Sequence, residues 1–139
     1  MPFKFSDSKE VDIPQLLELY RHAEWSKNRT AQEAEAVLSN SSLVFTLRDG
    51  QRLVAFARVL TDFIFRAAIY DVIVHPDVQN QGVGKALIYK VLTHPSLKNV
   101  PVFHLLTRDK RPFYEKLGFT TAPEQDYSAM IYLRNNEKK

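Results

Sequence analysis

The stretch Tyr70–Ala86, Y-D-V-I-V-H-P-D-V-Q-N-Q-G-V-G-K-A, decides how this chain is interpreted. Its β-branched residues end at Val74, a short polar loop follows, and Gln79-x-x-Gly82-x-Gly84 opens an apolar segment with helical spacing. This order predicts a strand, a loop and a helix whose first backbone N–H groups lack intrahelical partners. Because glycine lets the backbone approach a ligand and a helix N-terminus carries about half a positive charge, the pattern is suited to phosphate binding.

Two common nucleotide-binding motifs do not fit this stretch. A P-loop needs Gly-x4-Gly-Lys-Ser/Thr, but Gln79 stands at its first position and Ala86 at its last. The hydroxyl that would bind magnesium is therefore missing. A Rossmann fingerprint needs a third glycine where this chain has Leu87. ATP and NAD are poor candidates for the ligand.

Composition indicates one ordinary globular domain over residues 1–139, with 45% hydrophobic and 25% charged residues. The absence of cysteine excludes disulfides, a thiolate nucleophile and the usual zinc sites, and we expect no metal cofactor. The formal charge of +3 is scattered among acidic residues, which predicts no nucleic-acid partner. No stretch reaches a membrane-spanning length, and residues 1–7 lack the apolar core of a signal peptide. We expect a cytoplasmic protein without a membrane partner.

The patterns along the chain predict an α+β fold, a mixed sheet of six or seven strands with helices on both faces. Asp12 is expected to cap the first helix and Thr30-Ala31-Gln32-Glu33 to form a capping box for the second. Asp109 is expected to cap the last helix, and Gly118 fits its left-handed end. The expected helices are 13–23, 31–38, 82–93 and 109–117. The expected strands are 3–5, 43–47, 52–60, 67–74, 100–106, 119–121 and 127–133.

Two motifs together resemble one known family. Val74-x4-Gln79-x-x-Gly82-x-Gly84 resembles the acyl-CoA signature of the GCN5-related N-acetyltransferases, the GNAT superfamily. About 30 residues downstream, Pro112–Phe119 (P-F-Y-E-K-L-G-F) is similar to the F-Y-x-x-x-G-F segment of the same family. The resemblance is strongest from Leu53 to Phe119. It implies a single GNAT domain and transfer of an acetyl group from acetyl-CoA to an amine.

The resemblance also implies which residues hold the cosubstrate. Ile73 and Val74 would lend backbone groups to the pantetheine arm, in a gap where the family splays its two central strands. The loop from Gln79 to Lys85 would hold the diphosphate. The implied residues are Ile73, Val74, Gln79, Asn80, Gln81, Gly82, Val83, Gly84, Lys85, Phe113 and Tyr114. The partner of the 3′-phosphate stays open among Lys85, Arg108, Lys110, Arg111 and Lys116.

Tyr114 matches the family tyrosine that protonates the leaving thiolate. A phenol with a pKa near 10 stays protonated at neutral pH, whereas a free thiol titrates near 8.5. We therefore expect Tyr114 to act as the general acid.

The general base is less defined by the sequence. Many family members carry a glutamate or histidine on the strand before the signature, but the comparable positions here are Ala68 and Tyr70. Tyr70 and Asp71 are the candidate catalytic residues on this strand. Strand alternation places them on opposite faces, unless a bulge turns Asp71 toward the substrate. A base acting through water, or an amine that is already neutral, fits as well.

The acceptor is expected to be a small-molecule primary amine. Trp25 is either a core residue or a wall of the acceptor pocket, and Asp62 is a candidate partner for a cationic acceptor. Two alternatives stay open: a protein N-terminus or lysine as acceptor, and an acyl-CoA-binding module without catalysis. The chain is expected to be a monomer or a homodimer.

Overall fold

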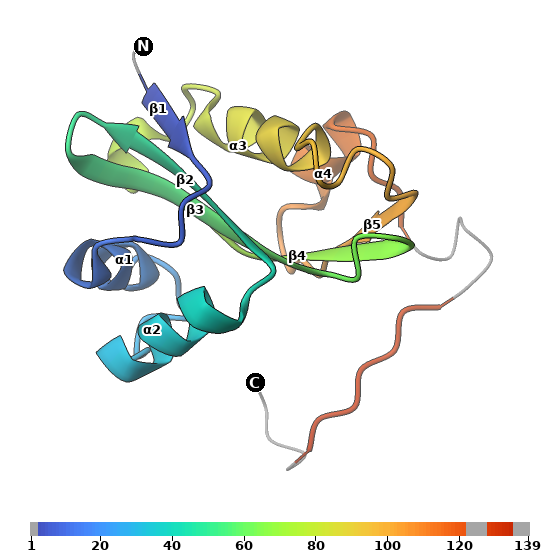
Figure 1. The fold of residues 1–139 in the computed structure, drawn as a ribbon, viewed down its shortest axis with the longest axis horizontal. Helices are drawn as coiled ribbons and strands as arrows, with labels where there is room; N and C mark the ends of the chain where they lie inside the picture. The colour runs from blue at the N-terminus through green and yellow to red at the C-terminus, as the bar shows by residue number, and fades with distance from the viewer. Residues whose placement is uncertain (1–2, 122–127, 135–139) are drawn as a thin grey trace. The chain divides into compact units, whose positions relative to one another are not determined.

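The computed structural model describes residues 3–121 and 128–134. The chain divides into two compact units, residues 1–105 and 106–139. The first unit contains nearly all of the regular structure (Figure 1). The expectation of a single domain over residues 1–139 stays a prediction.

The first unit is built on a mixed sheet. In the described part of the chain this sheet has five strands in the order β1-β2-β3-β4-β5. The strands are β1 (Phe3–Ser6), β2 (Leu43–Asp49), β3 (Arg52–Thr61), β4 (Arg66–Val74) and β5 (Val102–His104). The first four pair antiparallel in sequence, and β5 pairs parallel with β4. The predicted α+β class with a mixed sheet is confirmed.

Helices cover both faces of this sheet (Figure 1). α1 (Ile13–Tyr20) and α2 (Ala31–Asn40) lie on one face, and α3 (Val83–Leu92) lies on the other. A short 3-10 helix, η1 (Pro76–Val78), connects β4 to the loop before α3. No helix within residues 3–121 and 128–134 is both long and apolar enough to span a bilayer.

The two N-terminal helices begin where the capping residues predict. The Asp12 carboxylate accepts the backbone N–H of Gln15 at 3.1 Å. The hydroxyl of Thr30 accepts the N–H of Glu33, whose carboxylate accepts the N–H of Thr30, so the predicted capping box is confirmed. α1 ends at Tyr20 rather than near Ala23, because the next amides bond three residues back, His22 to Leu19 and Ala23 to Tyr20. The buried Ser26 hydroxyl also donates to the Tyr20 carbonyl.

The core under α1 and α2 fixes their place on the sheet. Leu16, Leu19 and Tyr20 of α1 pack with Phe56 of β3 and Ile73 of β4. Burying an aliphatic or aromatic side chain of this size contributes roughly 1.5–3 kcal/mol. Tyr20 carries its hydroxyl to the edge of this core, where it reaches a polar cluster described below.

The second unit is described separately and contains α4 (Arg111–Lys116). Asp109 does not cap this helix; Lys110 occupies the N-cap position without a side-chain hydrogen bond. Residues 119–121 are not a strand, since the chain turns back on α4 after Gly118. Of the predicted strand 127–133, Tyr127 lies outside the described residues, and residues 128–133 form no strand. A segment with alternating apolar residues forms a strand only when it pairs with a neighbouring strand.

Candidate functional site

The ladder between β4 and β5 is short. Only Arg66, Ala67 and Ala68 of β4 pair with β5, whose last residue is His104. β4 continues from Ile69 to Val74, paired on its other side with β3. In the described part of the chain, this half of β4 therefore has no strand on its β5 side. The backbone groups on this side of β4 can bind an extended ligand. The family resemblance predicts a gap between two strands for the pantetheine arm at Ile73 and Val74.

The loop after β4 leads into a helix start with free donors. Asn80 and Gly82 adopt left-handed backbone angles, with φ of 66° and 77°. Gly82 is the N-cap of α3 and offers no side-chain cap. The first helical hydrogen bond runs from Ala86 N–H to the Gly82 carbonyl at 3.0 Å. The amides of Val83, Gly84 and Lys85 make no hydrogen bond with another described residue.

These amides lie at the N-terminus of α3, which is the positive end of the helix dipole. The loop is therefore suited to binding a diphosphate. The Val83 side chain is buried in the core, so only its backbone can serve a ligand. The side chains of Gln79, Asn80, Gln81 and Lys85 are exposed. The Gln79 side chain donates to the Val74 carbonyl at 3.3 Å and links the loop to the end of β4.

His75 holds the base of this loop. Its N–H donates to the Val54 carbonyl at 2.8 Å, and its ring nitrogen Nδ1 accepts from the Asp77 N–H. The Arg52 guanidinium lies 3.0 Å from His75 Nε2 and donates to the Asp77 carboxylate at 2.7 Å. Burial, and then the charge of Arg52, lower the pKa of His75. The His75 ring is therefore a structural part of the loop.

In the second unit, the F-Y-x-x-x-G-F segment folds into a Schellman motif. Gly118, with φ of 100°, donates its N–H to the Glu115 carbonyl, and the Phe119 N–H donates to the Tyr114 carbonyl. This turn brings the centroid of the Phe119 ring to 5.7 Å from that of the Tyr114 ring, and the centroid of the Phe113 ring lies 4.9 Å from it. The glycine and the second phenylalanine of the motif thus fix the position of the tyrosine.

Tyr114 is 8% exposed, and burial raises the pKa of its hydroxyl to about 12. The hydroxyl makes no hydrogen bond to another described residue. A phenol in this state remains a proton donor throughout the physiological pH range. Phe113 contacts the tyrosine ring and supports its orientation.

A β-bulge in β4 brings Tyr70 and Asp71 to the same face of the sheet. Phe56 pairs with Ile73 and Arg58 pairs with Tyr70, so Asp71 and Val72 face a single residue of β3. Asp71 has a φ of 56°, which turns its side chain away from strict alternation. Strict alternation, which would place the two residues on opposite faces, does not hold here; the structure has the bulge that the sequence analysis left open as the exception.

Asp71 is the centre of a polar cluster under α1. One carboxylate oxygen, Oδ2, accepts from the Tyr20 hydroxyl at 3.0 Å, from Arg29 Nη1 at 2.6 Å and from Arg58 Nε at 2.8 Å. The Asp71 side chain is only 5% exposed. The same guanidinium groups stack on rings: Arg29 on Tyr20 and Trp25, and Arg58 on Tyr70.

Comparison with known proteins identifies the family. A family model described as an acetyltransferase (GNAT) domain matches residues 40–121. This chain belongs to the GNAT family. The match spans β2 to α4, the part that carries both motifs.

Three relatives illustrate the GNAT assignment. The chain is 33% identical over 124 residues to the uncharacterized N-acetyltransferase ycf52 of Pyropia yezoensis, covering 86% of this chain and 71% of the relative. It is 34% identical over 132 residues to the histone acetyltransferase TAP1 of Glycine max, covering 86% of this chain and 57% of that protein. A GNAT-family structure from Xanthomonas campestris pv. campestris superposes with a TM-score of 0.83 at 30% identity, covering 98% of this chain and 97% of the other.

The structure changes the interpretation of two predicted acceptor residues of this GNAT chain. Trp25 is 50% exposed, so it is not a core residue, and its role as a wall of the acceptor pocket stays a prediction. Asp62 Oδ1 accepts the backbone N–H groups of Ile64, Phe65 and Arg66. These hydrogen bonds lower the pKa of Asp62 and show that it shapes the β3–β4 turn. Its predicted pairing with a cationic acceptor stays untested.

Arg29 and Arg58 were missed by sequence reasoning. Arg58 is one basic residue in the strand β3, and Arg29 lies in the break between α1 and α2, where nothing in the local pattern distinguishes it from a surface residue. The signal that could have found Arg58 is its interruption of the otherwise apolar run from Leu53 to Leu60. Nothing local indicated that both would meet at Asp71.

Glu18, His22 and His75 place possible metal-ligand atoms within 4.8 Å of one another. The Arg52 guanidinium lies 3.0 Å from His75 Nε2 and would oppose a cation beside that ring. This donor set therefore fits a metal poorly, and the expectation of a metal-free protein stays a prediction.

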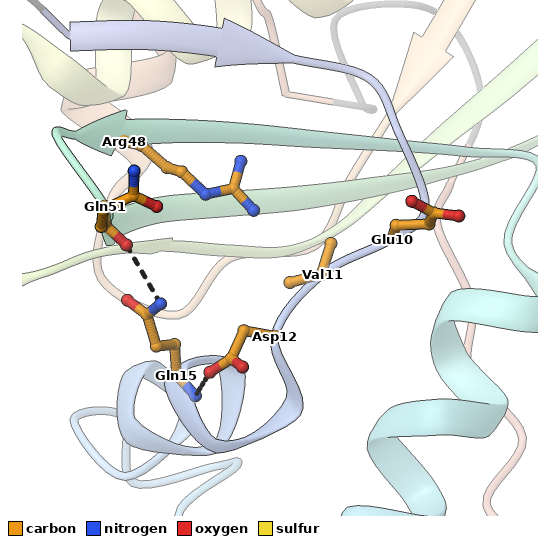
Figure 2. Close-up of a pocket in the computed structure, with 6 residues that line it drawn as sticks. All are labelled: Glu10, Val11, Asp12, Gln15, Arg48 and Gln51. Carbon is orange, nitrogen blue, oxygen red and sulfur yellow. Dashed lines mark hydrogen bonds between the residues drawn. The ribbon is translucent and has the colours of Figure 1, made fainter.

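A separate polar hollow lies between the start of α1 and the β2–β3 turn (Figure 2). The Gln15 side chain donates to the Gln51 carbonyl at 3.1 Å across it. Its lining residues are Glu10, Val11, Asp12, Gln15, Arg48 and Gln51. None of the residues predicted to bind the cosubstrate lines this hollow.

Proposed function

We propose that this GNAT chain transfers the acetyl group of acetyl-CoA to a primary amine of a small molecule. The observation that carries the proposal is the helix start at Gly82. Among the described residues, the amides of Val83 to Lys85 have no hydrogen-bond partner, and Ile69–Val74 of β4 has no strand on its β5 side. A free helix N-terminus suits a diphosphate, and an unpaired strand edge suits an extended pantetheine arm. Acetyl-CoA contains both groups.

The proposed reaction is a direct attack. The neutral amine nitrogen forms a bond to the thioester carbonyl carbon, the C–S bond breaks, and the thiolate takes a proton. Tyr114 supplies that proton or a hydrogen bond, since its hydroxyl stays protonated at neutral pH. Backbone N–H groups near Val74 polarise the carbonyl oxygen. The proton lost by the amine goes to water, and Tyr114, where it has given its proton to the thiolate, regains one from water.

The base role predicted for Asp71 receives no support from its contacts. The carboxylate oxygen Oδ2 already accepts three hydrogen bonds, two of them from guanidinium groups. We propose instead that Asp71 positions Arg29 and Arg58, and that the amine arrives neutral or loses its proton through water. Tyr70 forms part of the same surface through its contact with Arg58.

A protein lysine or N-terminus is the second candidate acceptor. The relative from Glycine max is called a histone acetyltransferase, although this chain spans just over half of that protein. The cytoplasm remains the proposed location, and monomer or homodimer the proposed state.

Isothermal titration with coenzyme A and an amine-acetylation screen test the proposal together. We expect saturable coenzyme A binding and acetyl transfer to at least one small amine. Binding without transfer to any amine or peptide would favour the acyl-CoA-binding module, and no binding would reject the proposed function.

A further inference from the structure

The polar cluster under α1 carries more positive than negative charge. Asp71 is the one carboxylate that contacts Arg29 and Arg58; no second carboxylate of the described residues lies within 4.0 Å of either guanidinium. Both arginines are largely buried, with side chains 26% and 18% exposed. Two cations and one anion leave an excess positive charge in a partly desolvated place, which is unfavourable unless another anion joins it.

The aromatic rings leave the edges of both guanidinium groups available. Arg29 lies 4.7 Å from the Tyr20 ring centre and 5.4 Å from that of Trp25, and Arg58 lies 5.2 Å from that of Tyr70. Stacking covers guanidinium faces, whereas hydrogen bonds leave from the edges. Each group uses one nitrogen to reach Asp71. Since a guanidinium has five N–H donors, most remain to bind a further anion.

The cluster lies beside the part of β4 proposed to receive the thioester. Asp71 and Tyr70 belong to the Ile69–Val74 segment that has no β5 partner in the described structure. Trp25 and Tyr70 are 50% and 38% exposed, so their rings can also contact the organic part of a bound molecule.

We propose that the acceptor is a primary amine that also carries an anionic group, a carboxylate or a phosphate, bound by Arg29 and Arg58. This inference rests on the proposed acetyltransferase function and narrows its substrate class. Asp71 positions the two guanidinium groups, and the acceptor anion completes the charge balance of the cluster.

The test compares amines that differ only in the anion. Suitable pairs are tyrosine and tyramine, and glucosamine 6-phosphate and glucosamine, each assayed with acetyl-CoA for kcat/KM. A charge-assisted hydrogen bond has a strength that corresponds to roughly 10–100-fold in affinity, so we expect the anionic member of at least one pair to be preferred by about that factor. The first pair measures the preference for a carboxylate, and the second pair measures the preference for a phosphate.

Arg29→Gln should remove most of this preference by raising KM for the anionic amine much more than KM for the neutral amine. Arg58 still pairs with Asp71 in this variant, which favours correct folding. Arg21→Gln is the matched control, because Arg21 is an exposed arginine that pairs with Glu18 on the helix surface. Should Arg29→Gln fail to give a cooperative melting curve, Arg29→Lys retains the charge without the planar fork and should reduce the preference.

Three results would overturn the inference. Neutral amines acetylated as well as their anionic counterparts would reject the anion site and leave the acetyltransferase function standing. A preference that persists in folded Arg29→Gln or Arg29→Lys would also reject it. No acetylation of any amine would overturn the proposed function and this inference together.

Discussion

Replacing Gly84 with alanine tests whether this position needs a glycine for folding or for ligand binding. Gly84 is the second residue of α3, and its φ is not among the positive values of the chain. Alanine is favoured over glycine inside a helix by about 0.5–1 kcal/mol. The substitution should therefore raise the melting temperature, by roughly 2–5 °C for a chain of this size.

The same substitution should weaken coenzyme A binding. A methyl group at Gly84 would stand among the free amides of Val83 to Lys85, where the diphosphate is proposed to approach the backbone. Loss of one charge-assisted hydrogen bond costs about 1.5–3 kcal/mol, which corresponds to a rise in Kd of roughly 10–100-fold. Higher stability with lower affinity is the outcome that the structure predicts.

Gly82→Ala is the matched comparison. Its φ of 77° is strained for alanine by about 1–2 kcal/mol, although a Cβ there meets no atom within 4 Å. This variant should be less stable, and Gly82→Asn should recover part of the loss because asparagine tolerates the left-handed region.

Melting curves and titration calorimetry with coenzyme A on the same preparations measure both quantities. If Gly84→Ala raised the melting temperature and left the Kd unchanged, the amides at the start of α3 would not be the diphosphate site. If Gly82→Ala had the melting temperature of the wild type, the left-handed conformation assigned to Gly82 would be wrong.

Three further substitutions test other parts of the molecule. Tyr114→Phe should lower kcat without changing the Kd of coenzyme A, and the wild type should keep the proton of Tyr114 up to high pH, since its pKa is about 12; an unchanged kcat would remove its role as the acid. The pKa of His75 is lowered on folding, so the unfolded chain binds its proton more readily and the free energy of unfolding should fall as the pH drops below about 6.5. His75→Asn should flatten that dependence in urea unfolding series, whereas an unaltered slope would assign it to other groups. Asp71→Asn should destabilise the fold by about 3–5 kcal/mol, because Arg29 and Arg58 lose their shared anion. Normal stability with abolished turnover would instead support Asp71 as the base.

Local sequence signals predicted the elements that depend on nearby residues. Asp12 and the Thr30–Glu33 box start their helices as predicted, because a cap needs a side chain and an N–H two or three positions away. Gly118 turns left-handed for the same local reason. The predictions of the last two strands were wrong because a strand depends on a partner elsewhere in the chain. α1 ends early where the Tyr20 carbonyl accepts from the Ala23 N–H and from the distant Ser26 hydroxyl.

The sequence by itself determined the loop at Gln79 to Lys85, since the order of strand, glycines and apolar helix is written in consecutive residues. Only the tertiary structure decided which side chains form the cluster proposed to bind the acceptor. The bulge at Asp71 depends on the register between β3 and β4, and it reverses the face that alternation assigns. Arg29 and Arg58 lie 42 and 13 residues from Asp71. Arg58 meets Asp71 because β3 pairs with β4, and Arg29 meets it because the segment between α1 and α2 folds against the sheet. Charges brought together by packing leave no spacing in the sequence from which they could be predicted.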